Sequence, residues 1–387
     1  MADRGKKVLV VSNTSFFLYN FARGLMKTLR EEGFQVTAVA PRDDFTERLE
    51  QEGFPVIPLR QLDRKGSNPI QDARLFGELF HVYRREQPGL CLHFTIKVNV
   101  YGSIAAKLAR TKSVCTVTGL GWLFTEKGVV TAIGGMLYKI LYRIAFAFTE
   151  KVIFQNRDDR DFFLQRKLVS NDKALVTPGV GVDTGYFFPQ GGASEQNKRR
   201  VSFLLIARML WDKGIGEFVE AARKVRQHYP DAEFCLLGPI DHGNRSAIPR
   251  DSIERWEADG LVRYLGATDD VRPFISRSHA VVLPSYREAI GKTLLEAMSM
   301  GKPIIAADSP GCRDTVEEGK NGFLVPVKNS ARLADAFMKF INLSVEERER
   351  MGSYGRDKVV REFDQTIVNS VYVDVIKHAL AEVPRKG

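Results

Sequence analysis

Short apolar segments of strand length alternate along this chain with longer segments whose apolar residues recur at helical spacing. Such alternation is typical of parallel sheets, because parallel strands need a long crossover that a helix usually supplies. A first series of strands is expected at Val8–Ser12, Gln35–Ala40, Val56–Leu59, Leu90–Phe94, Val114–Val117 and Lys151–Gln155, with helical patterns such as Phe21–Glu32 and Asn99–Ala109 between them. A second series begins at Val201 and continues through Ala232–Leu237, Val262–Tyr264, Ala280–Leu283, Ile304–Ala306 and Phe323–Val325. We therefore expect an α/β protein with two doubly wound domains.

A Gly- and Pro-bearing stretch separates the two series. It runs from Thr177 to Gly192 and leads into the polar segment GGASEQNKRR, a composition typical of linkers. We place the first domain at residues 1–188, the second at residues 199–364, and a last amphipathic helix within residues 365–387. With 387 residues, of which 44% are hydrophobic, the chain is long enough to bury two cores.

The segment Ser285–Gly301, SYREAIGKTLLEAMSMG, carries two glutamates eight positions apart, Glu288 on an expected loop and Glu296 on the helix that follows. Within one helix eight residues span about 12 Å, too far for both acids to act on one bond, but suitable for two parts of an extended ligand. Backbone N–H groups from Ala289 to Lys292 would point out of the helix N-terminus, where the macrodipole favours phosphate or sugar oxygens. The alternative is that Glu288 caps a loop and Glu296 is solvated.

A second polar turn follows the apolar segment that starts near Phe203. Here Arg208 and Lys213 flank a turn at the carboxyl end of the expected strand, before Gly214 and an amphipathic helix. Ligands of open α/β sheets bind at that end, and an Arg fork with a Lys point charge suits a diphosphate. Taken alone, two such cations are ordinary surface residues.

Together with the run GKPIIAADSPGCRDTVEEGKNGFLV, these two turns resemble the nucleotide-sugar half of retaining glycosyltransferase family 4, with the GT-B architecture. The segments HFTIKVNVYGSIAAKLA and TVTGLGWLF, which start at His93 and Thr116, are similar to bacterial members that add a sugar, often an N-acetylhexosamine, to polyprenyl-diphosphate-linked intermediates of capsule, O-antigen or glycoprotein glycans. The resemblance implies two Rossmann-like domains facing across a cleft, with the last helix crossing back onto the first domain.

The resemblance also implies roles for individual residues. Glu288 would hydrogen-bond hydroxyls of the donor sugar, Glu296 would bind the ribose, and the cations would stabilise the leaving diphosphate, so that Glu288, Arg208 and Lys213 form the catalytic set. Front-face attack would retain the anomeric configuration. The remaining donor-binding residues would be Ala289, Ile290, Gly291, Lys292, Gly238, Thr118 and Gly119. The chain departs from the usual pattern at Ala289 and Gly291, where Gly and Pro are common, and at Thr118, where many members have His.

Acceptor binding is expected at the first domain's strand ends. His93 ends the strand LCLHF and Lys97 follows it, a pair that suits an acceptor diphosphate or a donor anion, although a structural histidine is the common alternative. The loop NTSFFLYN after the first strand lacks GxGxxG, which argues against nicotinamide binding, and it also lacks the paired glycines of many family members. Phe16, Phe17 and Tyr19 would line this loop, facing the acceptor or the membrane, or else belong to the core. Asn13, Phe17 and Asn20 are the residues of this loop expected to bind the acceptor.

Positive charge gathers in the first half of the chain. Residues 1–185 contain 27 Lys and Arg against 19 Asp and Glu, a net charge of +8, whereas the remainder carries only +2 of the total of +10. An anionic membrane surface is favoured over nucleic acid, because no RNA-binding or zinc-finger signature is present. The cations beside apolar segments are Arg60, Arg64, Lys65, Lys139 and Arg143. The helix around Lys139 and Arg143 could instead be buried against the sheet with its cations reaching solvent.

The remaining patterns are consistent with a peripheral protein at the cytoplasmic face of the bacterial inner membrane. The four cysteines show no paired or metal-ligand spacing, and we expect reduced, mostly buried thiols. No signal peptide and no apolar run of about 18 residues is found. No metal site is expected, since the pairs Asp43/Asp44, Asp158/Asp159 and Asp269/Asp270 lack a strand-edge DxD arrangement; no cofactor is expected beyond a UDP-sugar as donor substrate.

Two other functions fit the same residues. A UDP-sugar epimerase of GT-B architecture would act without any acceptor. A noncatalytic nucleotide- or membrane-binding module would bind UDP and turn nothing over. The motifs leave the donor sugar, the acceptor glycan and the linkage open.

Overall fold

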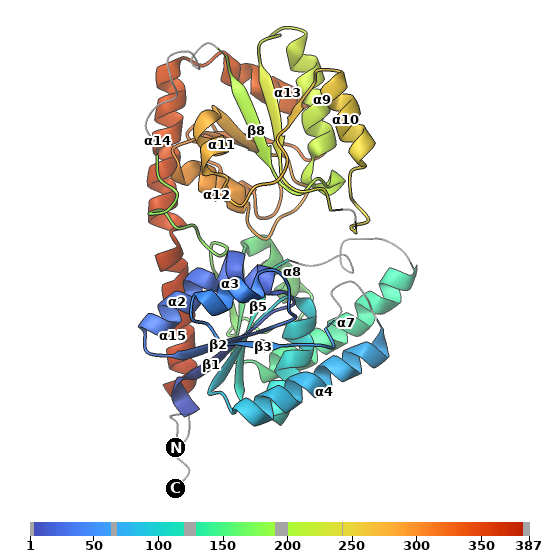
Figure 1. Cartoon of the computed structure of the whole chain (residues 1–387), viewed down its shortest axis with the longest axis vertical. Coiled ribbons are helices and arrows are strands. Elements are labelled where there is room, and N and C mark those ends of the chain that lie inside the picture. The colour runs from blue at the N-terminus through green and yellow to red at the C-terminus, as the bar shows by residue number, and fades with distance from the viewer. Residues whose placement is uncertain (1–3, 63–67, 120–128, 190–199, 242, 382–387) are drawn as a thin grey trace. The chain divides into compact units, whose positions relative to one another are not determined.

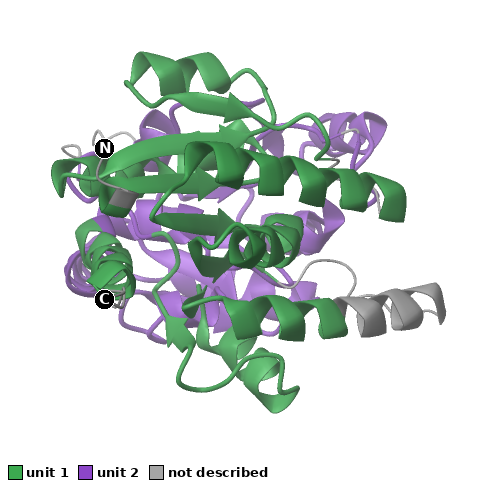
Figure 2. Cartoon of the chain, turned by 90° about the horizontal axis from the view of Figure 1, so that it is seen from below, with its two compact units in different colours: residues 1–180, 366–387 green, residues 181–365 purple. Residues whose placement is uncertain are grey.

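The computed structural model describes residues 4–62, 68–119, 129–189, 200–241 and 243–381 (Figure 1). They form two compact units: unit 1 comprises residues 1–180 and 366–387, and unit 2 comprises residues 181–365 (Figure 2). Each unit is built on one parallel sheet with helices on both faces. The predicted α/β architecture of two doubly wound domains is therefore confirmed.

Unit 1 has seven strands among the described residues, one more than predicted. They are β1 (Lys7–Val11), β2 (Gln35–Ala40), β3 (Val56–Pro58), β4 (Leu90–Phe94), β5 (Lys112–Val117), β6 (Lys151–Phe154) and β7 (Ala174–Val176). Its helices are α1 (Ser15–Phe17), α2 (Arg23–Glu31), α3 (Thr46–Gln51), α4 (Pro69–Glu86), α5 (Ser103–Leu108), α7 (Val129–Phe148), α8 (Arg157–Gln165) and α15 (Gln365–Ala381). The π-helical turns η2 (Leu18–Ala22) and η3 (Val98–Gly102) precede α2 and α5.

The strands of unit 1 are apolar on both faces because helices cover both. Along β1, Val8 and Val10 pack with α2, α3 and α15, whereas Leu9 and Val11 pack with α4 and α5. Farther along the sheet, α7 and α8 cover β5 and β6. Each side chain inside a central strand is therefore buried under one helical layer or the other.

Unit 2 repeats this arrangement on six strands. They are β8 (Ser202–Ile206), β9 (Glu233–Leu237), β10 (Arg263–Tyr264), β11 (Ala280–Leu283), β12 (Ile304–Ala307) and β13 (Gly322–Val325). Its helices are α9 (Ile215–Arg226), α10 (Arg250–Ala258), α11 (Arg272–Arg277), α12 (Lys292–Ser299), α13 (Ser330–Ile341) and α14 (Val345–Glu362), with the 3₁₀ turns η5 (Trp211–Lys213) and η6 (Arg313–Thr315). One face of the sheet packs on α9, α10 and α13, and the other on α11, α12 and α14.

The boundary between the units lies earlier than the predicted residue 188. The backbone of Val182 bridges to Asp364, and Arg356 donates to the carbonyls of Thr184 and Phe187, so residues 181–188 pack within unit 2. Helix α15 belongs to unit 1, where Tyr372 and other apolar side chains enter the core (Figure 2). Residues 190–199 of the predicted linker lie outside the described residues.

Each sheet has one place where the direction of winding reverses. The strand orders are β3-β2-β1-β4-β5-β6-β7 and β10-β9-β8-β11-β12-β13. In unit 1 the chain winds outward in opposite directions from β1 and β4, and in unit 2 from β8 and β11. The carboxyl ends of these strand pairs are the topological switch points at which open α/β sheets bind ligands.

Candidate functional site

The loop after β8 carries the two predicted cations of unit 2. Arg208 follows the strand, and its Nη1 donates to Asp241 Oδ2 at 2.8 Å. Lys213 ends η5, and Gly214 follows with a φ of +74°. A Cβ on Gly214 would lie 2.2 Å from Pro284 O, so only glycine lets this turn approach the end of β11 so closely.

Lys213 and Glu288 meet as an ion pair at the switch point of unit 2. Lys213 Nζ lies 2.5 Å from Glu288 Oε1, and the two side chains are 17% and 16% exposed. The Glu288 backbone N–H donates to Pro310 O at 2.9 Å, which ties this loop to the segment after β12. Because the pair is largely shielded from water, its attraction exceeds that of a surface ion pair. Two of the three predicted catalytic residues are thus in direct contact.

The prediction that the N–H groups from Ala289 to Lys292 all point outward is wrong for two of them. Gly291 N–H donates to Gly311 O at 2.7 Å, and Lys292 N–H donates to Ile290 O at 2.8 Å. The loop after β12 comes this close because Gly311 has a φ of +77°, and a Cβ there would lie 2.3 Å from Glu288 O. The chain is folded back on itself at this point before α12 begins.

Glu296 is buried rather than solvated, which removes the alternative considered for it. It lies on α12, is 6% exposed, and its Oε1 is 3.7 Å from Lys292 Nζ. Burial raises the pKa of its carboxyl, and the neighbouring ammonium opposes that rise. A buried carboxylate whose pKa is perturbed at a switch point is a candidate for ligand binding.

Gly238 brings the ends of β9 and β8 together. Its φ is +143°, and a Cβ there would lie 2.0 Å from Ala207 O. Its N–H donates to Gly266 O, and its carbonyl accepts from the Tyr264 hydroxyl, both at 2.8 Å. The structure thus gives this residue a role in close backbone approach, whereas its donor-binding role stays a prediction.

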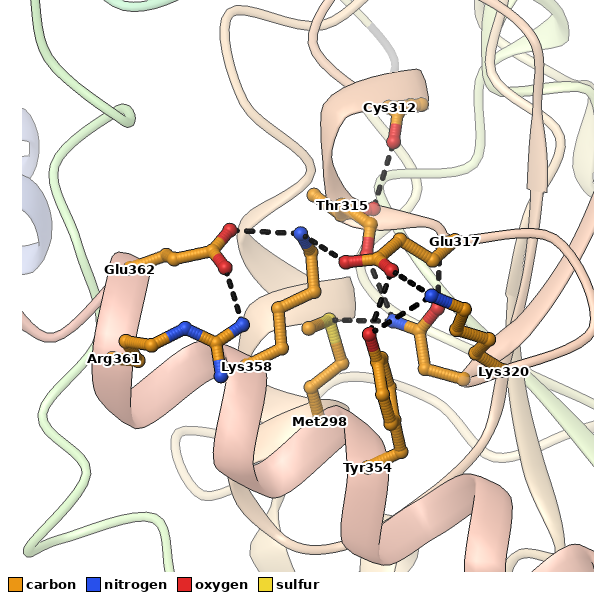
Figure 3. A network of polar contacts seen from close by, with 10 residues as sticks. Met298, Cys312, Thr315, Glu317, Lys320, Tyr354, Lys358, Arg361 and Glu362 are labelled. Carbon is orange, nitrogen blue, oxygen red and sulfur yellow. Dashed lines mark hydrogen bonds and ion pairs between the residues drawn. The ribbon is translucent and has the colours of Figure 1, made fainter.

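A polar network that the sequence did not predict supports the segment between β12 and β13 (Figure 3). Glu317 accepts from the Tyr354 hydroxyl at 2.7 Å and from Lys358 and Lys320 at 2.9 and 3.1 Å. These hydrogen bonds, led by that of Tyr354, lower the pKa of Glu317 to about 2. Lys358 also donates to Glu362 at 2.8 Å, so the network fastens the segment between β12 and β13 to α14.

His93 lies inside unit 1, and its predicted acceptor-binding role is wrong. The side chain is fully buried, and its Nε2 lies 3.0 Å from the Tyr83 hydroxyl of α4. Burial lowers the pKa of the imidazole to about 3, so the ring is neutral at physiological pH. The reason is its place within β4, where alternate side chains must face the helices.

Lys97 pairs with Asp72 instead of with His93. Its Nζ lies 2.7 Å from Asp72 Oδ1, the two side chains are 13% and 10% exposed, and the Tyr101 hydroxyl donates to the other Asp72 oxygen at 2.9 Å. The predicted pairing of the two basic residues is therefore wrong, because a carboxylate from α4 neutralises the ammonium. Contact of Lys97 with an acceptor stays a prediction.

Some side chains of the loop after β1 pack against neighbouring residues of unit 1. Phe17 lies against Phe94 of β4 with ring centroids 5.4 Å apart, while Asn20 donates to Phe16 O. Asn13 is half-buried. At the end of β5, Thr118 and Gly119 are also half-buried, and the TGLG motif continues outside the described residues. In the loop after β1, Phe17 thus packs against the core, which was one of the two alternatives considered for it.

Buried polar atoms at the same edge of unit 1 were missed by the sequence reasoning. Among the described residues, Ser12 Oγ, Thr95 Oγ1, Asn99 Oδ1 and Gln155 Nε2 are buried without a hydrogen-bond partner in the protein. Ser12, Thr95 and Gln155 directly follow β1, β4 and β6, and Asn99 lies in η3. Buried polar atoms without a hydrogen-bond partner are rare in folded proteins. The position of these polar residues after strand ends is the sequence feature that could have identified them.

The expected membrane-facing cations are only partly described. Arg60, Lys139 and Arg143 are exposed, whereas Arg64 and Lys65 lie outside the described residues. No helix in the described ranges is long and apolar enough to cross a membrane. The four cysteines are free, and three of them are buried.

Both halves of the chain match models of glycosyltransferase families. The family "Glycosyl transferases group 1" matches residues 190–358, and "Glycosyl transferase 4-like" matches residues 7–156.

Two curated relatives match over most of their length. The N,N'-diacetylbacillosaminyl-diphospho-undecaprenol alpha-1,3-N-acetylgalactosaminyltransferase of Campylobacter jejuni is 27% identical over 385 residues, which cover 96% of this chain and 99% of the relative. The UDP-Gal:alpha-D-GlcNAc-diphosphoundecaprenol alpha-1,3-galactosyltransferase of Escherichia coli is 24% identical over 325 residues, or 79% of this chain and 81% of the relative. Among solved structures, Anabaena Alr3699/HepE in complex with UDP superposes with a TM-score of 0.76 at 20% identity over 96% of this chain and 100% of that chain. At this identity the likeness shows the fold.

Proposed function

Because the chain belongs to the glycosyltransferases, with a group 1 half and a family-4-like half, we propose that it moves a sugar from a UDP-sugar to a polyprenyl-diphosphate-linked acceptor. The sugar is proposed to be an N-acetylhexosamine, and the reaction to retain the anomeric configuration.

The observation that carries the proposal is the ion pair of Lys213 and Glu288 at the switch point of unit 2. A transferred sugar leaves behind a nucleoside diphosphate whose negative charge grows as the glycosidic bond breaks. Lys213 and Arg208, which pair with Glu288 and Asp241 in this structure, lie on the same loop, and the proposal is that both also contact the diphosphate and stabilise its growing charge. Two such cations can do the work of a divalent ion, and we propose that transfer is metal-independent.

The two glutamates divide the donor between them. Glu288, held by Lys213, accepts hydrogen bonds from hydroxyls of the donor sugar, and the buried Glu296 accepts from those of the ribose. The turn that contains Ala289 and Ile290 contributes to binding of the donor. The acceptor hydroxyl attacks from the face that the diphosphate leaves, and the leaving phosphate oxygen takes its proton, which retains the configuration. The UDP complex of the Anabaena neighbour supports the choice of nucleotide.

The names of the relatives support a polyprenyl-diphosphate-linked acceptor, and we propose that unit 1 binds it. Both curated relatives are named for transfer to sugars on diphospho-undecaprenol. The orphaned polar atoms at the carboxyl edge of unit 1, among them Asn99 Oδ1, mark a region where polar ligand groups or water could be bound. Because such an acceptor is held in a membrane, the proposed location of the protein is peripheral, at the cytoplasmic face of the inner membrane.

A direct test incubates the purified chain with a panel of UDP-sugars and polyprenyl-diphosphate-linked glycans, with and without EDTA. We expect UDP release and a lengthened glycan only when a donor and an acceptor are both present. EDTA should not change the rate. NMR of the product should show an α-linkage when the donor sugar is α-linked. Conversion of a UDP-sugar without acceptor would instead indicate an epimerase. Binding of UDP without turnover of any pair would indicate a noncatalytic module.

A further inference from the structure

Helix α7 has two distinct faces. Tyr142, Ala145 and Phe146 are buried against the sheet of unit 1. On the other side of the helix, Ile140, Ile144 and Phe148 are 47%, 41% and 41% exposed. These three residues are four positions apart, so they form one line along the helix. The expectation that this helix is merely buried holds for one face and fails for the other.

Positive charge borders this apolar stripe. Lys139 and Arg143 are exposed on one flank, and Lys107 of α5 lies with its Nζ 5.9 Å from the centre of the Phe148 ring. Leu108, next to Lys107, is 58% exposed and extends the apolar surface. The sequence of α7, VVTAIGGMLYKILYRIAFAF, contains neither Asp nor Glu.

A hollow opens beside the stripe. Its volume is about 730 Å³, and it lies between the end of α7 and the segment after α8. Apolar side chains such as Phe146 and Leu168 line it together with Arg143, Lys167 and Lys173. Arg143 Nε donates to Lys167 O at 2.9 Å, which holds the guanidinium beside the hollow.

We propose that this α7 face, comprising Ile140, Ile144, Phe148 and Leu108 with Lys107, Lys139 and Arg143, docks on an anionic lipid bilayer. Helices that lie in a membrane surface bury an apolar face and place Lys and Arg beside anionic headgroups. A protein partner of ordinary surface composition would not require three cations beside this stripe with no acidic residue on the helix itself. The inference rests on the proposed function, because a polyprenyl-linked acceptor is found only at a membrane.

The test measures how much of the full chain sediments with lipid vesicles over a range of salt concentrations. One set of vesicles contains phosphatidylcholine alone, and the other also contains about 30% phosphatidylglycerol, an anionic lipid. We expect binding to anionic vesicles that salt weakens. The triple change Ile140→Ser, Ile144→Ser and Phe148→Ser should lower the partition coefficient by roughly tenfold or more. The triple change Lys107→Gln, Lys139→Gln and Arg143→Gln should lower it mainly at low salt.

The matched control is the triple change Val327→Ser, Val360→Ser and Ile367→Ser, whose residues are 40%, 43% and 38% exposed and lie outside this face. It should bind vesicles like the wild type. The docking proposal fails if the wild type does not bind anionic vesicles, if both α7 variants bind as well as the wild type, or if the face instead mediates self-association that the serine variant abolishes.

Transfer to a short-chain, detergent-soluble acceptor separates the two proposals. Transfer without vesicle binding overturns the docking face alone, and vesicle binding without transfer overturns the glycosyltransferase proposal alone.

Discussion

The two units share their central strand order, yet their switch points present different chemistry. In unit 2 the charged side chains of Lys213 and Glu288 meet at the edge of the sheet. In unit 1 the basic residues at the matching place turn inward, so that His93 contacts Tyr83 and Lys97 pairs with a carboxylate of α4. The topology fixes where a site can lie, but it does not fix which side chains face that site.

For His93 and Glu288, the difference follows from where each residue lies relative to the end of its strand. His93 lies inside β4, and each side chain of a central strand points to a face that helices cover. Glu288 lies beyond the end of β11 and after Pro284, where the backbone has left the sheet. Only a residue past the strand end is free to turn toward the edge.

Breaking the ion pair of unit 2 should have the largest effect. Lys213→Ala removes the cation proposed to stabilise the leaving diphosphate. Hydrogen bonds to charged groups contribute about 1.5–3 kcal/mol, so we expect UDP affinity and turnover each to fall by roughly tenfold to a hundredfold. Arg208→Ala should act in the same direction but less strongly, because Arg208 is 42% exposed. Calorimetry with UDP and initial rates of transfer measure both effects.

The matched control removes a cation from the other switch point. Lys97→Ala also abolishes an ion pair, but one inside unit 1, so it should lower stability and leave UDP affinity unchanged. Unchanged UDP binding in the variants of both Arg208 and Lys213 would contradict the assignment of unit 2 as the donor site.

The second prediction concerns the buried histidine of unit 1. His93→Leu leaves the Tyr83 hydroxyl buried without this partner, which should cost about 1–3 kcal/mol in the free energy of unfolding. Because His93 touches no ligand in our account, UDP affinity should not change. Chemical denaturation and calorimetry are the two measurements.

A double-mutant cycle sharpens this prediction. Tyr83→Phe removes the other side of the contact, and the double variant should be less destabilised than the sum of the two single variants. A loss of transfer that exceeds the loss of folded protein in His93→Leu would restore an acceptor role for this residue.

The sequence predicted the fold, and it located the residues of the candidate site in unit 2, for the same reason. Strand and helix periods are local properties, and the positions of Arg208, Lys213 and Glu288 after strands could be read from neighbouring residues. What it missed depends on contacts between distant segments. The support of Glu317 by Lys358 joins residues 41 positions apart, and the pairing of Lys97 with Asp72 spans 25. The direction of His93 was predictable in principle from the alternation along β4.

Glu296→Gln should separate binding from stability in unit 2. Burial raises the pKa of this carboxyl, so the charged form lowers the stability of the unliganded protein, and the loss grows as pH rises from the ordinary value through the folded pKa. The variant should therefore be slightly more stable than the wild type at pH 7, with the gain vanishing toward acid pH. UDP should bind roughly tenfold more weakly if Glu296 holds the ribose.

Glu288→Gln is the comparison variant for this test. It should depress turnover while leaving UDP affinity nearly intact, because Glu288 is assigned to the sugar and not to the nucleotide. Equal effects of the two substitutions on UDP and on UDP-sugar binding would remove the distinction between them.

The smallest effect is expected from the network behind the unit 2 loop. Hydrogen bonds from Tyr354, Lys358 and Lys320 lower the pKa of Glu317 to about 2 from an ordinary value of 4.5. A depressed carboxyl pKa stabilises the fold fully above the ordinary value, and this stabilisation is lost as pH falls toward 2. Glu317→Gln should therefore lower stability at neutral pH by about 1 kcal/mol or less, because the group is partly exposed.

The pH dependence distinguishes this network from a general loss of packing. The difference in melting temperature between wild type and Glu317→Gln should be largest near pH 7 and should shrink between pH 4.5 and 2. Glu220→Gln, which removes an exposed glutamate 3.7 Å from Arg223, serves as the control and should show almost no difference. A difference that stays constant with pH would mean that Glu317 supports the loop through its shape and not through its charge. The contrast between charged side chains at the sheet edge of unit 2 and packed side chains at that of unit 1 would then be confined to Lys213 and Glu288.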